Sequence, residues 1–289
     1  MIEALPQMRS GVARAAMLPD GARLHLQAGP IDLILWAEVD VRPVAHAAAV
    51  RRFDGLLEDL VAELAELRRQ GGQPQGVVAQ RMARAVAPHA PDFITPMAAV
   101  AGAVAEEVLG AMAAVAPGAK LWVNNGGDIA WQVGGDEEMR LAMAGGVIAV
   151  PASAPWRGCA TSGRGGRSHS LGIADAVTVL ARGAAVADAA ATMIANRVDL
   201  PGHPAVHRRP ADALSPDSDL GARLVTVGLD PLSEAEVALA LARGASHAAE
   251  LQARGVIGPV HLALQGQSRQ VGARDLITDE KMKLEERHG

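Results

Sequence analysis

The sequence predicts an α+β fold in which a mixed sheet is flanked by helices. A series of short apolar runs between residues 120 and 180 have the length of strands, and Gly and Pro separate them. Longer segments with apolar residues at helical spacing lie before and after this part of the chain. Helices and strands are therefore mixed without the strict alternation of a doubly wound fold, which favours a layered α+β architecture.

The first part of the chain is expected to form a hairpin followed by one long helix. Apolar runs at residues 23–27 and 31–39 are joined by Gly29-Pro30, which indicates two strands connected by a sharp turn. Residues 43–69 then carry apolar side chains at helical spacing, and the Gly71-Gly72 pair is a typical helix stop. The pattern therefore predicts a single helix over most of this stretch.

Further elements are expected along the rest of the chain. Thr95-Pro96 is typical of an N-cap and a first helical turn, and predicts another helix. A helix is expected over residues 186–196, and a proline-rich connection over 201–216. The Ser233-x-x-Glu236 capping box opens the last long helix. The strand candidates are residues 120–123, 129–133, 140–143, 147–150, 158–161, 176–180, 224–227 and 260–264.

Length and composition predict how the chain is divided. With 289 residues, we expect a single domain over 1–289, with two intimately packed halves as the alternative. A polar C-terminal tail is expected over residues 267–289. Hydrophobic residues make up 49% of the chain, yet there are only two Phe, four Trp and no Tyr. The core must therefore pack mainly through small side chains.

Charge and hydropathy exclude several classes of partner. The net charge of -5 and the absence of basic blocks argue against nucleic acid. No uninterrupted apolar run approaches the length of a spanning helix and no export signal is recognisable, so we expect a cytoplasmic protein that has no membrane partner. The lone Cys159 cannot form an internal disulfide and is expected to be an inert buried thiol. A homo-oligomer is compatible with this composition.

The segment VNNGGDI holds the first group of candidate ligand-binding residues: Asn125, Gly126, Gly127 and Asp128. Glycines let the backbone approach a ligand, and side-chain amides can bind phosphate or carbonyl oxygens. The alternative is an ordinary tight hairpin, because Asn and Gly are common turn residues. From the residues alone, both interpretations stay open.

A second group lies in the segment from Ala160 to Ser170. Thr161, Ser162 and Gly163 place hydroxyls and main-chain N–H groups at the end of a strand candidate. Arg167 could bind a phosphate through its guanidinium, and His169 could act as a base or stack on a ring. The alternative is a solvated loop in which His169 is a surface residue.

The third group is a carboxylate and a hydroxyl at the start of a predicted helix. Asp188 and Thr192 are four residues apart, so they lie on the same helix face. Oxygen ligands of this kind suit Mg²⁺, which takes a few protein oxygens together with phosphate and water. The alternative is a plain helix start, in which Asp188 favours the first turn.

Taken together, VNNGGDI, residues 159–192 and the ADAAAT helix start resemble the core of the ApbE superfamily, and read closest to its short, cytosolic, uncharacterised branch. The resemblance implies an ApbE-like mixed-sheet fold, FAD as cofactor, and a Mg²⁺ ion at Asp188 and Thr192. It implies a Mg²⁺-dependent FMN transferase or an FAD-hydrolysing relative, with an acceptor or redox protein as a partner. The alternatives are a non-catalytic nucleotide-binding or accessory protein in redox or sulfur metabolism, and a scaffold.

The chain departs from the family pattern at two places. Residues 99–108 resemble the family's AKGYAVD helix, yet Ala101 stands where the lysine would be and Glu106 where the aspartate would be. The HIIDPxTG loop of the family shortens here to residues 169–176, which lack the proline and the TG pair. Catalytic groups from this loop would then be His169 or Asp175.

Overall fold

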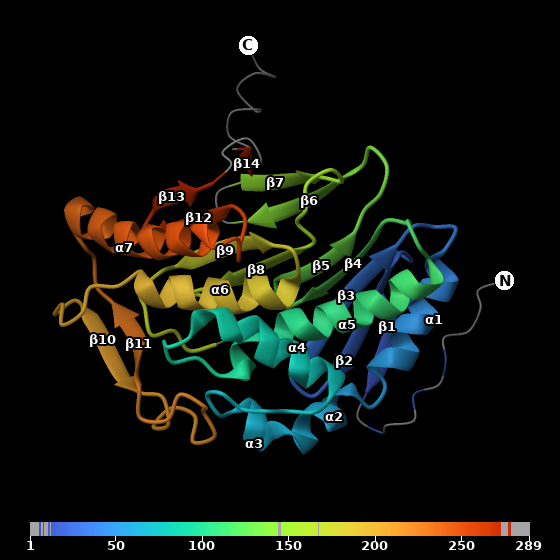
Figure 1. Cartoon of the computed structure of the whole chain (residues 1–289), viewed down its shortest axis with the longest axis horizontal. Helices are drawn as coiled ribbons and strands as arrows, with labels where there is room; N and C mark the ends of the chain where they lie inside the picture. Colours follow the sequence, from blue (N-terminus) through green and yellow to red (C-terminus); the bar gives the residue numbers. More distant parts are fainter. Residues whose placement is uncertain are drawn as a thin grey trace, which may run out of the picture. The chain divides into compact units, whose positions relative to one another are not determined.

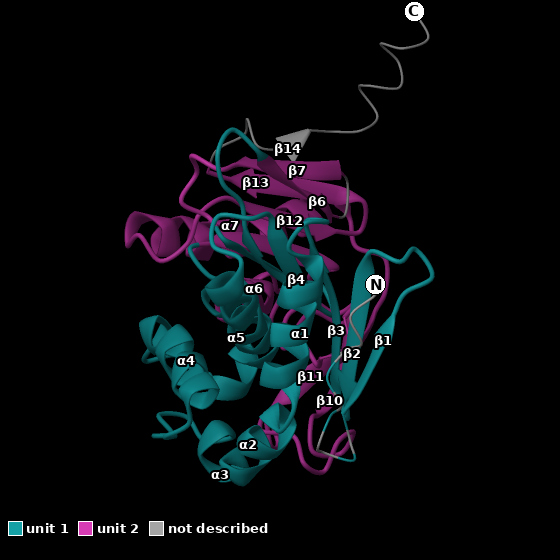
Figure 2. Ribbon diagram, turned by 90° about the vertical axis from the view of Figure 1, so that its right-hand side faces the viewer, with its two compact units in different colours: residues 1–137, 157–160, 182–188 teal, residues 138–156, 161–181, 189–289 magenta. Residues whose placement is uncertain are grey.

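The structure is a computed structural model that describes residues 6, 8, 11, 13–143, 146–166, 168–272 and 277–278. The chain divides into two compact units, coloured separately in Figure 2. Unit 1 comprises residues 1–137, 157–160 and 182–188, and unit 2 comprises 138–156, 161–181 and 189–289. The chain passes from one unit to the other within strand β8 (Gly158–Ser162) and helix α6 (Ala184–Arg197).

Unit 1 contains an antiparallel sheet. Its strands follow the order β1-β2-β3-β4-β5, and β8 pairs with β5 through Gly158 and Cys159. One face of the β2–β3 hairpin is buried. It is formed by residues that alternate with more exposed ones, among them Leu24, Leu26 and Leu33. The hairpin predicted over residues 23–39 is confirmed. The bounds are β1 (Arg14–Met17), β2 (Arg23–Ala28), β3 (Ile31–Ala37), β4 (Leu121–Asn125) and β5 (Asp128–Gln132).

Helices α1 and α5 of unit 1 pack against each other, and α5 packs on β4 and β5 (Figure 1). Two 3₁₀ turns flank the stretch between α4 and α5. The bounds are α1 (Arg42–Phe53), α2 (Leu56–Ala62), α3 (Leu64–Leu67), α4 (Val77–Val86), η1 (Ala87–His89), η2 (Pro96–Ala99) and α5 (Val100–Val115).

The prediction of one long helix over residues 43–69 is wrong. The structure has three helices there, and the first break falls at Asp54 and Gly55. Asp54 is extended with ψ 120°, and Gly55 has φ 83°, a left-handed conformation that suits glycine. The apolar spacing continues through the break because α2 still buries Leu56 and Leu60.

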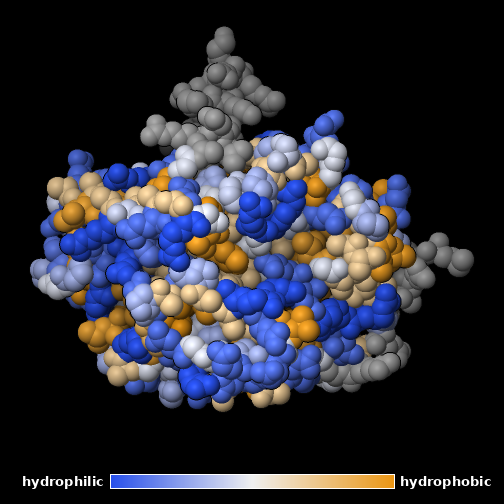
Figure 3. All heavy atoms as spheres, in the orientation of Figure 1, coloured by the Kyte–Doolittle hydropathy of each residue, from blue (hydrophilic) through white to orange (hydrophobic). Residues whose placement is uncertain are grey.

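The segment Pro96–Val115 is the one described stretch that is long and apolar enough to cross a membrane, with mean hydropathy 1.6. It behaves as a core helix, because Ala103, Val104, Val108 and Met112 are fully buried. Figure 3 shows one face of the molecule on which hydrophilic residues predominate and hydrophobic ones are scattered.

Unit 2 is also built from antiparallel strands and long helices. Strands β9 and β13 pair on either side of β12, and α7 packs on β12 and β13. Strands β6, β7 and β14 form a second sheet, and β10 and β11 form a hairpin. The bounds are β6 (Glu138–Met143), β7 (Gly146–Pro151), β9 (Ala176–Ala181), β10 (Val206–Pro210), β11 (Leu224–Leu229), α7 (Glu234–Ala253), β12 (Val260–Leu264), β13 (Gln267–Val271) and β14 (Ile277–Thr278).

Two predictions for unit 2 can be checked directly. The Ser233 capping box of α7 is confirmed, since Glu236 N–H donates to the Ser233 hydroxyl and Ser233 N–H donates to the Glu236 carboxylate. The segment predicted to be a polar tail begins with strand β13 at Gln267. Residues 273–276 and 279–289 lie outside the described part. The observed mixture of antiparallel sheets and helices confirms the α+β class.

Candidate functional site

Two carboxylates of unit 1 lie close together at the N-terminus of α5. One oxygen of Asp188 accepts a hydrogen bond from Gly102 N–H at 3.0 Å, and Ala101 N–H also donates to this carboxylate. Burial and the negative charge of Asp128 raise the pKa of Asp188 well above its usual range, although the two N–H donors oppose that shift. The protein thus brings two carboxyl groups near each other, and charging both of them is costly unless a cation compensates.

The VNNGGDI segment forms a hairpin and also contributes to this cluster. Gly126 and Gly127 make the two-residue turn between β4 and β5, with φ of 64° and 112°. Asn125 is buried at 5% exposure, and its side-chain amide donates to the Ala101 carbonyl at 3.1 Å. The turn therefore places Asn125 and Asp128 beside the start of α5, so the hairpin and ligand-binding interpretations are compatible.

Helices α5 and α6 cap each other through buried carboxylates. Asp188 of α6 accepts from first-turn N–H groups of α5, as described above. In return Glu106 of α5 accepts from Ala185 N–H at 2.8 Å and from Ala184 N–H, at the start of α6. Each carboxylate satisfies N–H groups that have no partner within their own helix and adds favourable charge at a helix N-terminus.

Glycines permit this close approach. A Cβ on Gly102 would lie 2.2 Å from the Ala184 carbonyl oxygen, and one on Gly158 would lie 2.1 Å from Ala184 N. These neighbours are backbone atoms, which cannot rotate away as a side chain can. Strand β8 and helix α5 therefore fix the position of the first turn of α6, four residues before Asp188.

Glu106 also belongs to an ion-pair network with two arginines and Glu107. Arg81 lies 3.3 Å from Glu106 and 2.7 Å from Glu107, and Arg52 lies 2.6 Å from Glu107. Burial raises the pKa of Glu106, and the N–H donors and Arg81 only partly offset it. The pKa of Glu107 is lowered because hydrogen bonds from Arg52 and Arg81 outweigh its burial. This role of Glu106 was not predicted from the sequence, where its one visible sign is a pair of Glu residues inside an otherwise apolar helix.

Cys159 behaves as expected for an inert thiol. It is 4% exposed, and burial together with the Asp128 charge raises its pKa to about 12. A thiol with such a pKa is protonated at neutral pH and is a poor nucleophile.

The hydroxyl residues of unit 2 form a second cluster. The Thr192 hydroxyl donates to the Ser162 hydroxyl at 3.5 Å, and Thr161 lies 2.9 Å from Thr178, oxygen to oxygen. Gly163 follows with φ 150°, and a Cβ there would lie 2.6 Å from the Asp175 carbonyl oxygen. The structure thus brings Thr192, Ser162 and Gly163 into one neighbourhood of unit 2.

The two predicted catalytic residues have different surroundings. One oxygen of Asp175 pairs with Arg164 at 2.6 Å and the other accepts from Gln265 N–H at 2.5 Å. His169 is exposed, and its Nε2 lies 3.4 Å from the Ser215 hydroxyl. Asp175 is thus fixed by structural contacts, whereas His169 lies on the surface. Arg167 is outside the described residues.

The carboxylate oxygens at this site suit a cation that also binds a ligand. Within the described residues, no group of three or more His, Cys, Asp or Glu side chains could hold a metal ion. Mg²⁺ is commonly held by one or two carboxylates together with substrate phosphates and water. Asp188 and Asp128 supply two neighbouring carboxylates, which fits that mode. Thr192 follows Asp188 by one turn of α6.

The described residues form an α+β protein in which Asp188 and Thr192 lie one turn apart on helix α6. The family model described as "AbpE bacteria" matches residues 15–270. The chain therefore belongs to this ApbE-related family.

Curated relatives from archaea are similar over part of the chain. A UPF0280 protein of Methanopyrus kandleri is 36% identical over 156 residues, which cover 52% of this chain and 61% of that protein. A UPF0280 protein of Archaeoglobus fulgidus is 43% identical over 108 residues, 36% of this chain and 45% of that protein. A third UPF0280 protein, from Methanosphaerula palustris, is 40% identical over 131 residues, which cover 42% of this chain and 52% of that protein. The aligned part thus spans about half of these relatives, whose names state no activity.

Proposed function

We propose that this ApbE-related protein binds FAD together with Mg²⁺. The observation that carries the proposal is the Asp128–Asp188 pair, whose mutual repulsion helps to raise the pKa of Asp188. A divalent cation would compensate both charges, and a pyrophosphate would complete its coordination.

Each part of the chain would then have a definite task. Asp188, with Asp128 beside it, would hold the cation, and Asn125 would keep the α5 N-terminus in place through Ala101. When bound, Mg²⁺ would neutralise the negative charge of the pyrophosphate. The family resemblance adds further contacts, which stay predictions to be tested one by one: Thr192 for the metal, and Gly126, Gly127, Thr161, Ser162, Gly163 and Arg167 for the flavin nucleotide.

Binding without efficient FMN transfer is the outcome that the contacts favour. The side chain of Ala101 carries no amine. Its main-chain carbonyl accepts from the Asn125 amide, and its N–H donates to the Asp188 carboxylate. Asp175 is occupied by Arg164 and Gln265 N–H, so a free base at this position is not supported. Transfer requires groups that stabilise the transition state, whereas binding requires only ground-state contacts. The second candidate, a Mg²⁺-dependent FMN transferase that acts on an acceptor protein, is favoured by the presence of both Asp188 and Thr192.

Thermal unfolding with FAD and Mg²⁺, added singly and together, tests the proposal. We expect stabilisation mainly with both, and about 2.7 kcal/mol at a ligand concentration one hundred times Kd. Asp188→Ala should lose the effect, whereas Asp217→Ala, which removes an exposed carboxylate, should keep it. An unchanged response in Asp188→Ala would contradict the metal assignment.

Mass spectrometry of an acceptor domain incubated with the protein, FAD and Mg²⁺ separates the two candidates. We expect FAD binding and little covalent flavin on the acceptor. Rapid stoichiometric modification would show that the chain is a working transferase.

A further inference from the structure

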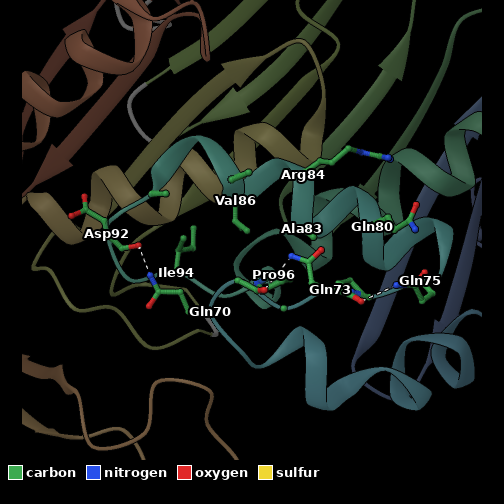
Figure 4. Close-up of a pocket in the computed structure, with 15 residues that line it drawn as sticks. Gln70, Gln73, Gln75, Gln80, Ala83, Arg84, Val86, Asp92, Ile94 and Pro96 are labelled. Carbon is green, nitrogen blue, oxygen red and sulfur yellow. Dashed lines mark hydrogen bonds between the residues drawn. The ribbon is translucent and has the colours of Figure 1, made fainter.

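A separate cavity of about 520 Å³ lies within unit 1, between residues 70–75, helix α4 and residues 90–96 (Figure 4). Its wall is largely apolar: Ala83 and Val86 come from α4, and Ile94 and Pro96 from the segment before α5. Val86, Ile94 and Pro96 are buried in the protein. A cavity of this size and polarity suits a small organic ligand. It contains none of the residues assigned above to flavin or Mg²⁺.

The loop that borders the cavity is held by two carboxylates. Glu66 accepts from Gln73 N–H at 2.8 Å. Glu63 accepts from Gly76 N–H at 2.7 Å and also from Gln75 N–H. Main-chain N–H groups of an irregular loop thus have charged partners, which strengthens these hydrogen bonds. The loop is therefore fixed before any ligand arrives, which lowers the entropic cost of binding.

Three glutamines of this loop present acceptors. Gln70 donates through its amide to the Asp92 carbonyl at 3.2 Å, and Gln73 donates to the Gly71 carbonyl at 3.2 Å. Gln75 donates to the Gln73 carbonyl at 3.0 Å, and Figure 4 shows the first and last of these bonds. Each amide keeps its oxygen acceptor and a second N–H donor, either of which can bond a ligand.

Helix α4 contributes a cation and a further amide. Gln80 and Arg84 both line the cavity and lie one turn apart on α4. Arg84 is exposed, and no ion pair to it is found in the described part of the chain. Figure 4 shows Asp92 at the opposite end of the cavity from Arg84. The cavity thus offers an anion-binding guanidinium at one end and acceptors at the other.

We propose that this cavity binds a nucleoside monophosphate whose base carries an exocyclic amino group. The planar base would lie on Val86, Ile94 and Pro96, and its amino group would donate to glutamine oxygens. The amide of Gln80 can pair with the edge of an amino-substituted purine, as glutamine does with adenine. The phosphate would pair with Arg84, whose fork of donors matches phosphate oxygens.

Calorimetric titration of the full chain with three probes tests the ligand class. Adenosine monophosphate should bind. Inosine monophosphate, which has a carbonyl in place of the amino group, and adenosine, which has no phosphate, should each bind at least about tenfold more weakly. Equal affinity for all three probes would overturn the assigned chemistry.

Variants locate the site. Arg84→Gln and Ala83→Phe should each weaken binding of adenosine monophosphate about tenfold or more, the first by losing the phosphate partner and the second by filling the cavity. Arg51→Gln, which removes an exposed arginine of α1, is the matched control and should bind normally. Because Arg84 is exposed, Arg84→Gln is expected to fold even where Ala83→Phe does not.

One further variant separates this cavity from the proposed flavin site. Asp188→Ala should bind adenosine monophosphate as the parent does, whether or not FAD binding survives. Binding lost in Asp188→Ala but kept in Arg84→Gln would place the nucleotide at the flavin site and overturn the inference.

Discussion

The carboxylates Asp188 and Glu106 of unit 1 and Asp175 of unit 2, in the loop between β8 and β9 that also contains His169, are held in different ways. Asp188 and Glu106 accept from main-chain N–H groups and lie where glycines bring backbones together. Asp175 pairs with Arg164, both side chains are 34% exposed, and Asp175 also accepts from Gln265 N–H. The difference is therefore burial: solvent and salt weaken an exposed ion pair, whereas they screen buried carboxylates much less. Substitutions should therefore have large effects in unit 1 and small effects in the loop.

The largest effect is expected at Gly102. Gly102→Ala should lower the free energy of unfolding by about 3 kcal/mol or more, because its Cβ would meet the Ala184 carbonyl oxygen at 2.2 Å. Gly110→Ala in the same helix should raise it by about 0.5–1 kcal/mol, since nothing lies within 4 Å of that Cβ. Urea unfolding of both variants measures this contrast. Equal effects would mean that the close approach of α5 and α6 has no energetic importance.

The next effect depends on pH and concerns His46 of α1. This histidine is 2% exposed, and burial, together with the Arg42 charge, lowers its pKa from 6.5 to about 4. The unfolded chain binds more protons between these values, so the protein should lose on the order of 2 kcal/mol of stability as pH falls through this window. His46→Leu should flatten the curve measured by unfolding at each pH.

A smaller loss is expected from removing the cap of α6. Glu106→Leu leaves Ala184 and Ala185 N–H groups without their acceptor and should cost about 1–2 kcal/mol. Glu106→Gln retains an acceptor oxygen and should cost less. Thermal unfolding and hydrogen exchange at the start of α6 measure the difference. If Leu and Gln have the same effect, the carboxylate does not act as a cap.

The smallest effects belong to the loop. Asp175→Asn should cost about 0.5 kcal/mol, because it weakens one exposed ion pair and keeps an acceptor for Gln265 N–H. His169→Ala should change stability by less than about 0.5 kcal/mol. Losses comparable to those in unit 1 would contradict the contrast between the two regions.

Local patterns predicted much of the fold. The turn residues Gly29-Pro30 and the capping box at Ser233 act through neighbours in the sequence, and both elements are found. The strands from β4 to β9 lie within two residues of their predicted bounds. The break at Gly55 was missed because the apolar spacing continues across it. Strand β10 was missed because HRRP is polar and lies in a proline-rich stretch.

The candidate site was predicted in part. Motifs pointed to Asn125, Asp128 and Asp188, and the structure brings these three to the start of α5. The role of Glu106 could not be read from the sequence, because its partner Ala185 is 79 residues away. The cavity beside α4 was also missed, since Arg84 and Gln73 come together only through tertiary folding.

FAD titration followed by flavin fluorescence, with Mg²⁺ or with EDTA, tests the proposed function most directly. Asp188→Asn is the informative variant, because its amide oxygen can still cap α5 while the negative charge is lost. We predict that the parent binds FAD at least about tenfold more tightly with Mg²⁺ than with EDTA, and that Asp188→Asn shows no such difference. Equal FAD affinity with Mg²⁺ and EDTA in the parent, or an undiminished Mg²⁺ effect in Asp188→Asn, would contradict a flavin–magnesium site at Asp188.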